Sequence, residues 1–279
     1  MVTRIVDEKE IENISFELLL EGIYKVYGYD FRSYAKASLK RRLNEFVQEN
    51  NVPNYFELLN SLIQDEEYFR KLLLKLTVTV TEMFRDPNFF KYFRETVIPF
   101  LRTYPSIRIW HAGCATGEEA YSMAILLKEE GLLKRSIIYA TDINNNSLDI
   151  AKEGIYSIEK MRKFSENYLA AGGIESFSNY YRVKYNSAII SDEFRDKIHF
   201  MHHNLGVDQV FAHFNVILCR NVLIYFDNKM QNQVLDLIYQ SLEHCGYLCL
   251  GGKEPLSGLP FENEYKRLSP RMCVYQKLR

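Results

Sequence analysis

The stretch that decides the fold is IRIWHAGCATGEEAYS, at residues 107 to 122. Its beginning, 107–110, is typical of a buried strand, and 118–127 has the apolar spacing of a helix. Gly113 and Gly117 bracket a tight turn between them. Glycine lets the backbone approach a ligand closely, and a helix start offers unpaired N–H groups. This order of strand, glycine turn and helix therefore predicts the entrance of a nucleotide-binding site.

The ligand predicted for this entrance carries no phosphate. The spacing from Gly113 to Gly117 is not the G-x-G-x-x-G of pyrophosphate binders. Glu118 and Glu119 open the helix where a phosphate would otherwise lie, and they would repel it. The next strand, 136–141, ends in Asp142, whose carboxylate can accept both hydroxyl groups of a ribose. An adenosine without phosphate suggests S-adenosylmethionine.

Five separated motifs then resemble a known family. In chain order they are TVTVTEMFRD at 77–86, GCATGEEAYS at 113–122, ATDINNNSLDIAKEGIY at 140–156, HHNL at 202–205 and CRNVLIYFD at 219–227. Together they resemble the chemotaxis-receptor protein-glutamate methyltransferases, the CheR family. The resemblance covers nearly the whole chain. It implies methylation of glutamate side chains on chemoreceptor cytoplasmic domains, with S-adenosylmethionine as methyl donor, S-adenosylhomocysteine as product and chemotactic adaptation as the outcome.

The resemblance also implies the fold class. We expect an α/β protein with a Rossmann-like seven-stranded methyltransferase sheet, a small antiparallel β-subdomain and a preceding all-α domain. The helical domain should span 1–76, and the methyltransferase domain 77–279 with the β-subdomain inserted at about 157–201. The apolar periodicity of 8–76 agrees, because it is helical and contains no convincing strand.

Cofactor-binding residues follow from the resemblance position by position. In the family the segment matching 77–86 lies across the cofactor, and here Thr79 stands where asparagine is usual. Glu119 is expected to reach the amino group of the cofactor, and Asn204 the adenine. The residues expected to contact the cofactor are Thr79, Thr81, Arg85, Gly113, Glu119, Asp142, Asn204, Leu205, Arg220 and Asn221.

Three residues are expected to serve the reaction itself. A guanidinium can hold a carboxylate through two parallel hydrogen bonds, so Arg85 suits either the cofactor or a substrate glutamate. Arg220 and Tyr225 are expected to orient the substrate carboxylate with it. A glutamate with a pKa of about 4.3 is ionised at neutral pH, so no general base is required.

The helical domain carries one marked charge feature. The stretch 31–44 contains five basic residues and no acid. In the family the corresponding helix is thought to dock on the acidic methylation region of the receptor. We therefore expect Lys36, Lys40 and Arg41 to steer an acidic helical substrate.

Composition limits the remaining possibilities. A net charge of −1 argues against a protein that coats nucleic acid. The sequence contains no run of about 18 apolar residues, so we expect no membrane insertion. The five cysteines lack zinc spacing, and the adjacent His202 and His203 point to opposite faces of a strand, so we expect no metal. The N-terminus has neither a basic region nor a long apolar stretch. We expect a cytoplasmic monomer.

Other functions remain open on the sequence. The chain could be a non-catalytic module that senses S-adenosylmethionine or scaffolds a receptor array. This alternative stays open because Thr79 and the Gly252-Lys253 pair depart from the family pattern. A small-molecule methyltransferase of the same fold would not need the basic helical domain. A nicotinamide-dependent oxidoreductase is the least favoured, because the phosphate fingerprint is absent.

Overall fold

The structure is a computed structural model that describes residues 7–77, 81–259, 261–269 and 271–278. Its contacts divide the chain into two units. One unit consists of Met1–Val78 together with Tyr225–Gln231, and the other of Thr79–Ile224 together with Asn232–Arg279.

The first unit is helical. Its helices are α1 (Glu8–Tyr27), α2 (Lys36–Glu49), α3 (Tyr55–Gln64) and α4 (Glu66–Leu76). Asp7, Asn54 and Asp65 begin α1, α3 and α4, and each side chain accepts hydrogen bonds from backbone N–H groups of the first turn. The apolar faces of these helices meet in one buried cluster. Capping and a shared core therefore explain why this segment is helical.

A short segment far along the chain belongs to this helical unit. Ala35 donates its N–H to the Tyr225 carbonyl at 2.9 Å, and Asp227 donates to the Ser33 carbonyl at 2.9 Å. The rings of Tyr34 and Phe226 lie edge to face, with their centres 5.1 Å apart. The loop before α2 is thus held by residues about 190 positions later in the sequence.

The second unit is built on a sheet. Within the described residues its seven strands follow the order β6 (Ile198–His202), β2 (Ser136–Asp142), β1 (Ile107–Ala112), β7 (Phe214–Cys219), β8 (Leu242–Leu250), β10 (Val274–Lys277) and β9 (Tyr265–Arg267). The pairs from β6 to β8 are parallel, whereas β10 runs antiparallel to β8 and to β9. The carboxyl ends of β1, β2, β6 and β7 therefore meet at one edge, where ligands bind in open α/β sheets.

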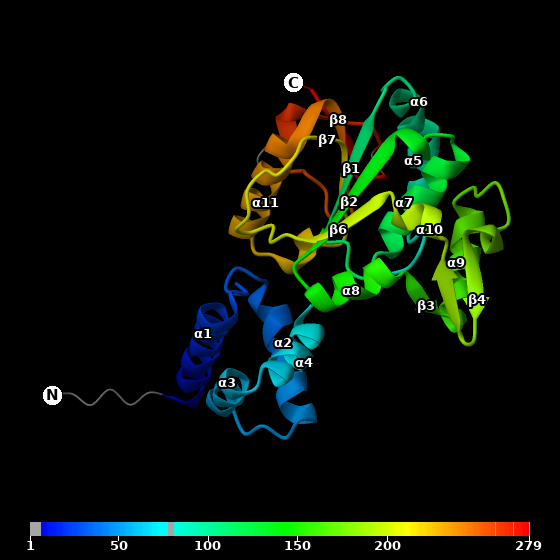
Figure 1. Cartoon of the computed structure of the whole chain (residues 1–279). Helices are drawn as coiled ribbons and strands as arrows, with labels where there is room; N and C mark the ends of the chain where they lie inside the picture. Colours follow the sequence, from blue (N-terminus) through cyan, green and yellow to red (C-terminus); the bar gives the residue numbers. More distant parts are fainter. Residues whose placement is uncertain (1–6, 78–80, 260, 270, 279) are drawn as a thin grey trace. The chain divides into compact units, whose positions relative to one another are not determined.

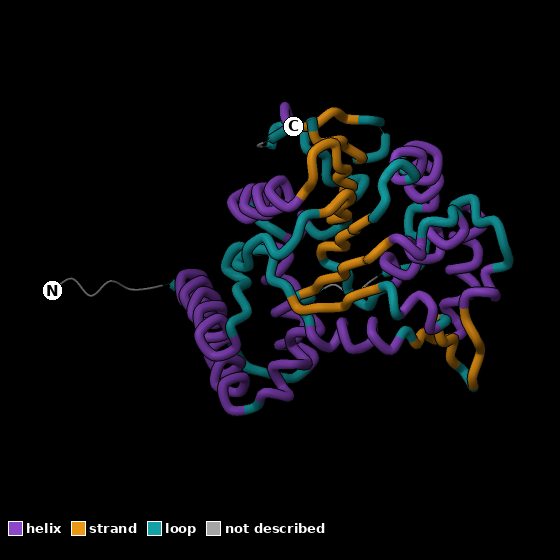
Figure 2. Tube along the Cα trace, turned by 45° about the horizontal axis from the view of Figure 1, so that its top comes forward, coloured by secondary structure: helices purple, strands orange, loops and turns teal. Residues whose placement is uncertain are grey.

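Helices cover both faces of the sheet, α11 on one and α5 and α7 on the other (Figures 1 and 2). The helices are α5 (Pro87–Thr96), α6 (Ile98–Leu101), α7 (Glu118–Glu129), α8 (Asn145–Glu153), α9 (Ile158–Ala170), α10 (Asp192–Arg195) and α11 (Asn228–Ser241). Short 3₁₀ turns lie at η1 (Leu133–Arg135), η2 (Phe177–Tyr180), η3 (Leu223–Tyr225) and η4 (Glu262–Glu264). Among the described helices, none is both long and apolar enough to cross a membrane.

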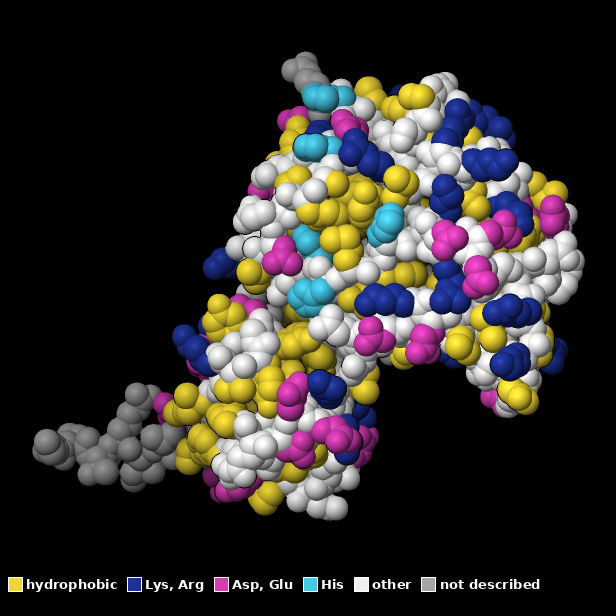
Figure 3. All heavy atoms as spheres, in the orientation of Figure 1, with side chains coloured by type: hydrophobic (Ala, Val, Ile, Leu, Met, Phe, Trp, Pro, Cys, Tyr) yellow, Lys and Arg dark blue, Asp and Glu magenta, His cyan; other side chains and the backbone are white. Residues whose placement is uncertain are grey.

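A second, smaller sheet lies between α8 and β6 in the sequence. Within the described residues its antiparallel strands follow the order β3 (Ile155–Ser157), β5 (Ser187–Ile190) and β4 (Tyr181–Lys184), and α9 lies between β3 and β4 in the chain. The expected fold class is confirmed: a seven-stranded α/β sheet with a small antiparallel sheet, preceded by a helical region. Basic and acidic side chains both occur on the face seen in Figure 3.

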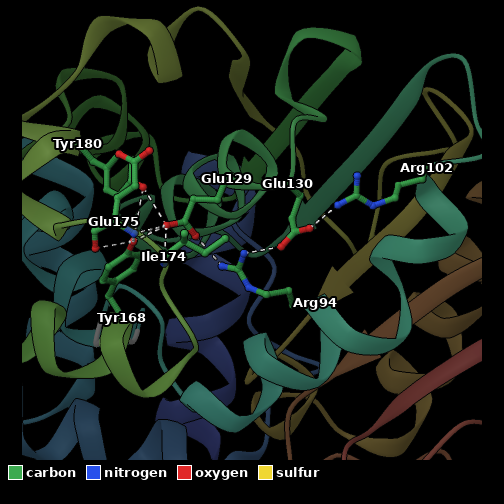
Figure 4. A network of polar contacts seen from close by, with 8 residues as sticks. All are labelled: Arg94, Arg102, Glu129, Glu130, Tyr168, Ile174, Glu175 and Tyr180. Carbon is green, nitrogen blue, oxygen red and sulfur yellow. Dashed lines mark hydrogen bonds and ion pairs between the residues drawn. The ribbon is translucent and has the colours of Figure 1, made fainter.

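A buried carboxylate joins the small subdomain to the main sheet. The Glu129 side chain, 1% exposed at the end of α7, contacts Arg94 of α5 at 2.6 Å (Figure 4). Its other oxygen accepts hydrogen bonds from the hydroxyls of Tyr168 and Tyr180 and from the Ile174 N–H. The spacing of apolar residues could not predict this cluster, because its members come from separate segments.

Substituting Glu129→Gln tests how much this cluster stabilises the second unit. The amide keeps the size of the side chain but removes one of the two carboxylates that pair with Arg94, which keeps Glu130 at 2.5 Å. Losing a hydrogen bond between charged groups costs about 2 kcal/mol. We expect the midpoint of thermal unfolding to fall by about 4–8 °C at pH 7. Glu166→Gln, which removes an exposed pair with Arg162, is the control and should change stability by less than about 0.5 kcal/mol.

The pH dependence of the stability difference between wild type and Glu129→Gln provides a further check. Burial would raise the pKa of Glu129, but hydrogen bonds from Tyr168 and Ile174 and the contact with Arg94 outweigh it and lower the pKa. A carboxylate whose pKa is lowered in the folded state stabilises that state at pH values above its unfolded-state pKa of about 4.3. This stabilisation is lost as the pH falls through the folded-state pKa. The gap between wild type and Glu129→Gln should therefore shrink below about pH 4. A constant gap down to pH 3 would contradict this account.

Candidate functional site

The loop from β1 to α7 needs both of its glycines. Gly113 and Gly117 have φ values of +78° and +90°. A Cβ on Gly113 would lie 2.5 Å from Val222 Cγ2, and one on Gly117 would lie 2.9 Å from the Cβ of Ala151. Side chains at these positions would be strained and would clash, so the loop can pass this close to its neighbours only with glycine.

The Asp142 carboxylate at the end of β2 fixes the same loop. Oδ2 accepts the N–H of Ala115 at 2.8 Å, and Oδ1 accepts the N–H of Asn144 at 2.9 Å. Burial raises the pKa of Asp142, although these N–H groups oppose the shift. Each carboxylate oxygen can accept a second hydrogen bond. A ribose contact at Asp142 is thus compatible with the structure and stays a prediction.

Arg220, directly after β7, is the centre of the site. Its side chain is 2% exposed and donates from Nη1 to Glu119 at 2.6 Å and from Nη2 to Asp86 at 2.8 Å. The guanidinium also lies 4.0 Å from the centre of the Phe89 ring. One side chain therefore connects the start of α5, the first turn of α7 and the end of β7. These two carboxylates engage Arg220 here, so its predicted hold on a substrate carboxylate stays untested.

Glu119 is held from two sides. Its second oxygen lies 3.0 Å from Nδ1 of His111, a β1 residue that is 1% exposed. Burial would raise the pKa of Glu119, but Arg220 and His111 outweigh it and lower the pKa to about 2. An ionised carboxylate can only accept, so His111 Nδ1 carries the proton. If Glu119 contacts the cofactor amino group as predicted, its carboxylate does so while it also binds Arg220 and His111.

The neighbouring Glu118 has a different environment. It is fully buried, accepts a hydrogen bond from the Thr116 hydroxyl at 2.6 Å, and has Lys160 Nζ at 3.9 Å. Burial raises the pKa of Glu118 to about 7. Among the described residues, Glu118 Oε1, His111 Nε2 and Arg220 Nε are buried without a hydrogen-bond partner. Orphaned polar atoms are rare in folded proteins and need an explanation such as a ligand or water.

Strained backbone surrounds Arg85. Phe84 and Asp86, on either side of it, have φ values of +51° and +57°. Non-glycine residues rarely adopt this conformation, which costs on the order of 1–3 kcal/mol and persists only where neighbours enforce it. Such strain clusters at functional sites, so it supports a role for Arg85. Of the other residues predicted in this segment, Thr81 is partly exposed, and Thr79 lies outside the described residues.

Two more predicted residues lie at the carboxyl edge of the sheet. Asn204, after β6, forms a turn in which its side chain accepts the Gly206 N–H at 3.0 Å, and Leu205 follows it, partly exposed. Asn221 follows Arg220 with φ +60°. The structure thus brings both to the edge that holds Asp142 and Arg220.

Sequence reasoning missed Glu254. Its carboxylate, 6% exposed, accepts the N–H groups of Asn221 at 2.6 Å, Gly251 at 2.8 Å and Ile224 at 3.1 Å. It therefore fixes the segment that follows β7. The available signal was its position directly after the Gly252-Lys253 pair, which departs from the family pattern.

The remaining predicted residues belong to the helical unit. The Tyr225 ring has the Arg42 guanidinium 5.1 Å from its centre. Each predicted docking residue has an acidic neighbour: Lys36 lies 3.4 Å from Glu17, Lys40 lies 3.9 Å from Glu12, and Arg41 lies 2.6 Å from Glu45. Their roles stay predictions. Within the described ranges, no three histidine, cysteine or acidic side chains form a group that could hold a metal.

Comparisons with known proteins identify the family. The model described as CheR methyltransferase, SAM binding domain, matches residues 79–270, and the model described as CheR methyltransferase, all-alpha domain, matches residues 14–77. Both ranges agree with the motifs that carried the resemblance.

Relatives of similar length agree. A Pseudomonas putida protein named Cher3 is 46% identical over 265 residues, which are 95% of this chain and 97% of that protein. Chemotaxis protein methyltransferase 1 of Pseudomonas aeruginosa is 28% identical over 277 residues, covering 95% and 98% of the two chains. The chemotaxis protein methyltransferase of Listeria innocua is 30% identical and covers 82% and 85%.

Among solved structures, the magnesium protoporphyrin IX methyltransferase of Synechocystis with bound SAH is 14% identical, with 69% of each chain covered and a TM-score of 0.32. PKMT2 from Rickettsia typhi in complex with AdoHcy is 10% identical, covering 52% of this chain and 21% of that one, also with a TM-score of 0.32. The family assignment is independent of these distant likenesses. With both family models and full-length relatives in agreement, the chain belongs to the CheR methyltransferase family, and its cofactor is S-adenosylmethionine.

Proposed function

We propose that the protein methylates glutamate side chains of chemoreceptor cytoplasmic domains, giving glutamate methyl esters. Relatives named chemotaxis protein methyltransferase support this function. With a cytoplasmic receptor domain as partner, the enzyme would act in the cytoplasm. We also propose that it acts as a monomer. The observation that carries the proposal is the arrangement around Arg85. It lies between two residues with strained backbone, and the next residue, Asp86, pairs with the buried Arg220, which also pairs with Glu119.

The residues at the sheet edge fit S-adenosylmethionine. Gly113 and Gly117 let the loop pass close to Val222 and Ala151, and Asp142 retains acceptor capacity for ribose hydroxyls. The orphaned atoms of His111 and Arg220 lie in the same polar chain. When bound, the cofactor supplies a methyl group on a sulfonium centre. Asn204 and Asn221 would extend the contact surface from the ends of β6 and β7.

The reaction requires the protein to position the substrate carboxylate rather than to transfer a proton. A substrate glutamate is ionised at neutral pH, so its oxygen can attack without a base. Arg85 can hold that carboxylate in the fixed geometry of a guanidinium pair. Arg220 and Glu119 keep the surrounding loops in place, and the buried rings of Phe89 and Phe90 pack against the Arg220 guanidinium.

Methyl transfer to a receptor fragment tests the function and the role of Arg85. We expect wild-type protein and labelled cofactor to transfer methyl groups to a purified chemoreceptor cytoplasmic fragment, with the label released as methanol by base. Arg85→Ala should lower kcat/KM by about 10²–10³. The control Arg162→Ala removes a guanidinium that is 90% exposed and should leave the rate unchanged.

The outcomes of this assay separate the proposals. Binding of S-adenosylhomocysteine without any labelled receptor would exclude receptor methylation and favour the non-catalytic sensor. If Arg85→Ala transfers methyl groups with an unchanged kcat/KM, Arg85 is excluded from the site, but the proposed function is still supported.

The exposed basic residues of α2 lead to a second prediction. Lys36 and Arg41 each have 65% of the side chain exposed, and their partners Glu17 and Glu45 are 69% and 40% exposed. Exposed pairs of this kind are weak, and an acidic helix could compete for the cations. We expect Lys36→Glu with Arg41→Glu to lower kcat/KM for the receptor fragment about tenfold at low salt, through KM, and the effect should fade at high salt.

A charge-matched control exists on α4. Arg70→Glu with Lys71→Glu changes the net charge by the same amount and likewise disrupts only exposed pairs, with Glu66 and Glu67. Equal losses in both double variants would show that net charge alone matters and would reject α2 as the docking face. Lys40 is left unchanged because its Nζ lies 5.1 Å from the buried Phe16 ring, so its loss could disturb folding.

A further inference from the structure

The segment that presents Arg85 is held at several points by other elements. The N–H of Phe84 donates to the Ser122 hydroxyl of α7 at 2.8 Å, and that hydroxyl donates to the Glu118 carbonyl at 2.7 Å. Ser122 is fully buried. On the other side of Arg85, Asp86 is bonded to Arg220. These contacts offset the cost of the left-handed residues that flank Arg85.

A third contact comes from the small subdomain. Asn167, on α9 and 4% exposed, donates both hydrogens of its amide, one to Glu82 Oε2 at 3.0 Å and one to the Met83 carbonyl at 3.1 Å. A buried amide inside a helix is unfavourable unless it is bonded, and here both donors are used on one short segment. Asn167 therefore holds two of the residues before Arg85, Glu82 and Met83.

Packing supports the same connection. The Phe84 ring is fully buried, and its centre lies 5.2 Å from the ring of Tyr168, the residue after Asn167. Tyr168 in turn donates to Glu129 and lies 5.1 Å from Phe177. The subdomain is thus linked to the Arg85 segment by the Asn167 amide and by contacts of the Phe84 ring with Tyr168 and Phe177. Asn167 and Tyr168 are adjacent positions of α9.

We propose that Asn167 is a positioning residue for methyl transfer, which fixes Glu82 and Met83 so that the strained segment presents Arg85, and that α9 thereby couples the small subdomain to the reaction centre. This rests on the proposed function, because the effect is defined on methyl transfer. Asn167 touches no reacting atom. It acts through the Glu82 side chain and the Met83 carbonyl.

The test uses the full-length chain and a receptor cytoplasmic fragment with labelled S-adenosylmethionine. Asn167→Asp keeps the shape of the side chain but turns both donors into acceptors that face Glu82 and the Met83 carbonyl. We expect kcat to fall about 10–100-fold, since small displacements of a positioning group have effects of this size, with KM for the fragment within about threefold. Rates are scaled to the folded fraction, which is measured by thermal unfolding.

Asn179→Asp is the matched control. Asn179 also donates its amide to a glutamate, Glu175 at 3.1 Å, in the same subdomain but away from residues 82–86. Its kcat should stay within twofold of wild type. An equal loss in Asn179→Asp and Asn167→Asp would show a general effect on the subdomain and overturn the proposal.

Two further variants keep the proposal testable if Asn167→Asp folds poorly. Adding Glu82→Gln to Asn167→Asp lets the new amide donate to the new carboxylate, and we expect kcat to recover at least threefold. Ser122→Ala removes the acceptor for the Phe84 N–H and should lower kcat as well. Because both contacts hold one segment, the losses in Ser122→Ala and Asn167→Asp should be non-additive.

The outcomes distinguish this proposal from the proposed function. No methyl transfer by wild-type protein would reject the function itself. Transfer by wild type with kcat unchanged in Asn167→Asp, or strictly additive losses with Ser122→Ala and no recovery with Glu82→Gln, would reject the positioning role and leave the function in place.

Discussion

A buried guanidinium between two carboxylates is the interaction on which the rest of the site depends. Taking a charged side chain out of water costs several kcal/mol unless partners are present, and Arg220 finds them in Glu119 and Asp86. These partners come from the first turn of α7 and the start of α5, so the sheet edge and two helix starts must be in place together. A lysine could not replace it, because a single ammonium lacks the planar fork that reaches two carboxylates at once.

The strained loops at this edge follow one pattern. Phe84, Asp86, Ala115 and Asn221 all have positive φ. Each is held by a polar side chain from another segment: Phe84 by Ser122, Asp86 by Arg220, Ala115 by Asp142 and Asn221 by Glu254. The residues that adopt unfavourable backbone conformations are therefore those whose hydrogen-bond partners are built into the sheet and its helices. Strain of this kind persists only where the surroundings over-determine it.

Local patterns in the sequence predicted the elements well. The strand, glycine turn and helix expected over residues 107–127 correspond to β1 and α7, and the strand expected to end in Asp142 is β2. These succeed because apolar periodicity and glycine act over a few residues. The partners of the buried polar groups could not be predicted, because Asn167 and Glu82 are 85 positions apart and Arg220 and Glu119 are 101 apart. Only the fold brings them together.

The two adjacent glutamates show why residue type alone does not decide a role. Arg220 and His111 outweigh burial at Glu119 and lower its pKa to about 2, whereas Glu118 has one hydroxyl partner and a distant lysine, so burial raises its pKa to about 7. Glu119 is therefore always ionised and suited to hold Arg220. Burial therefore makes Glu118 the more readily protonated of the two. A positive group close to Glu118 would favour its ionised form.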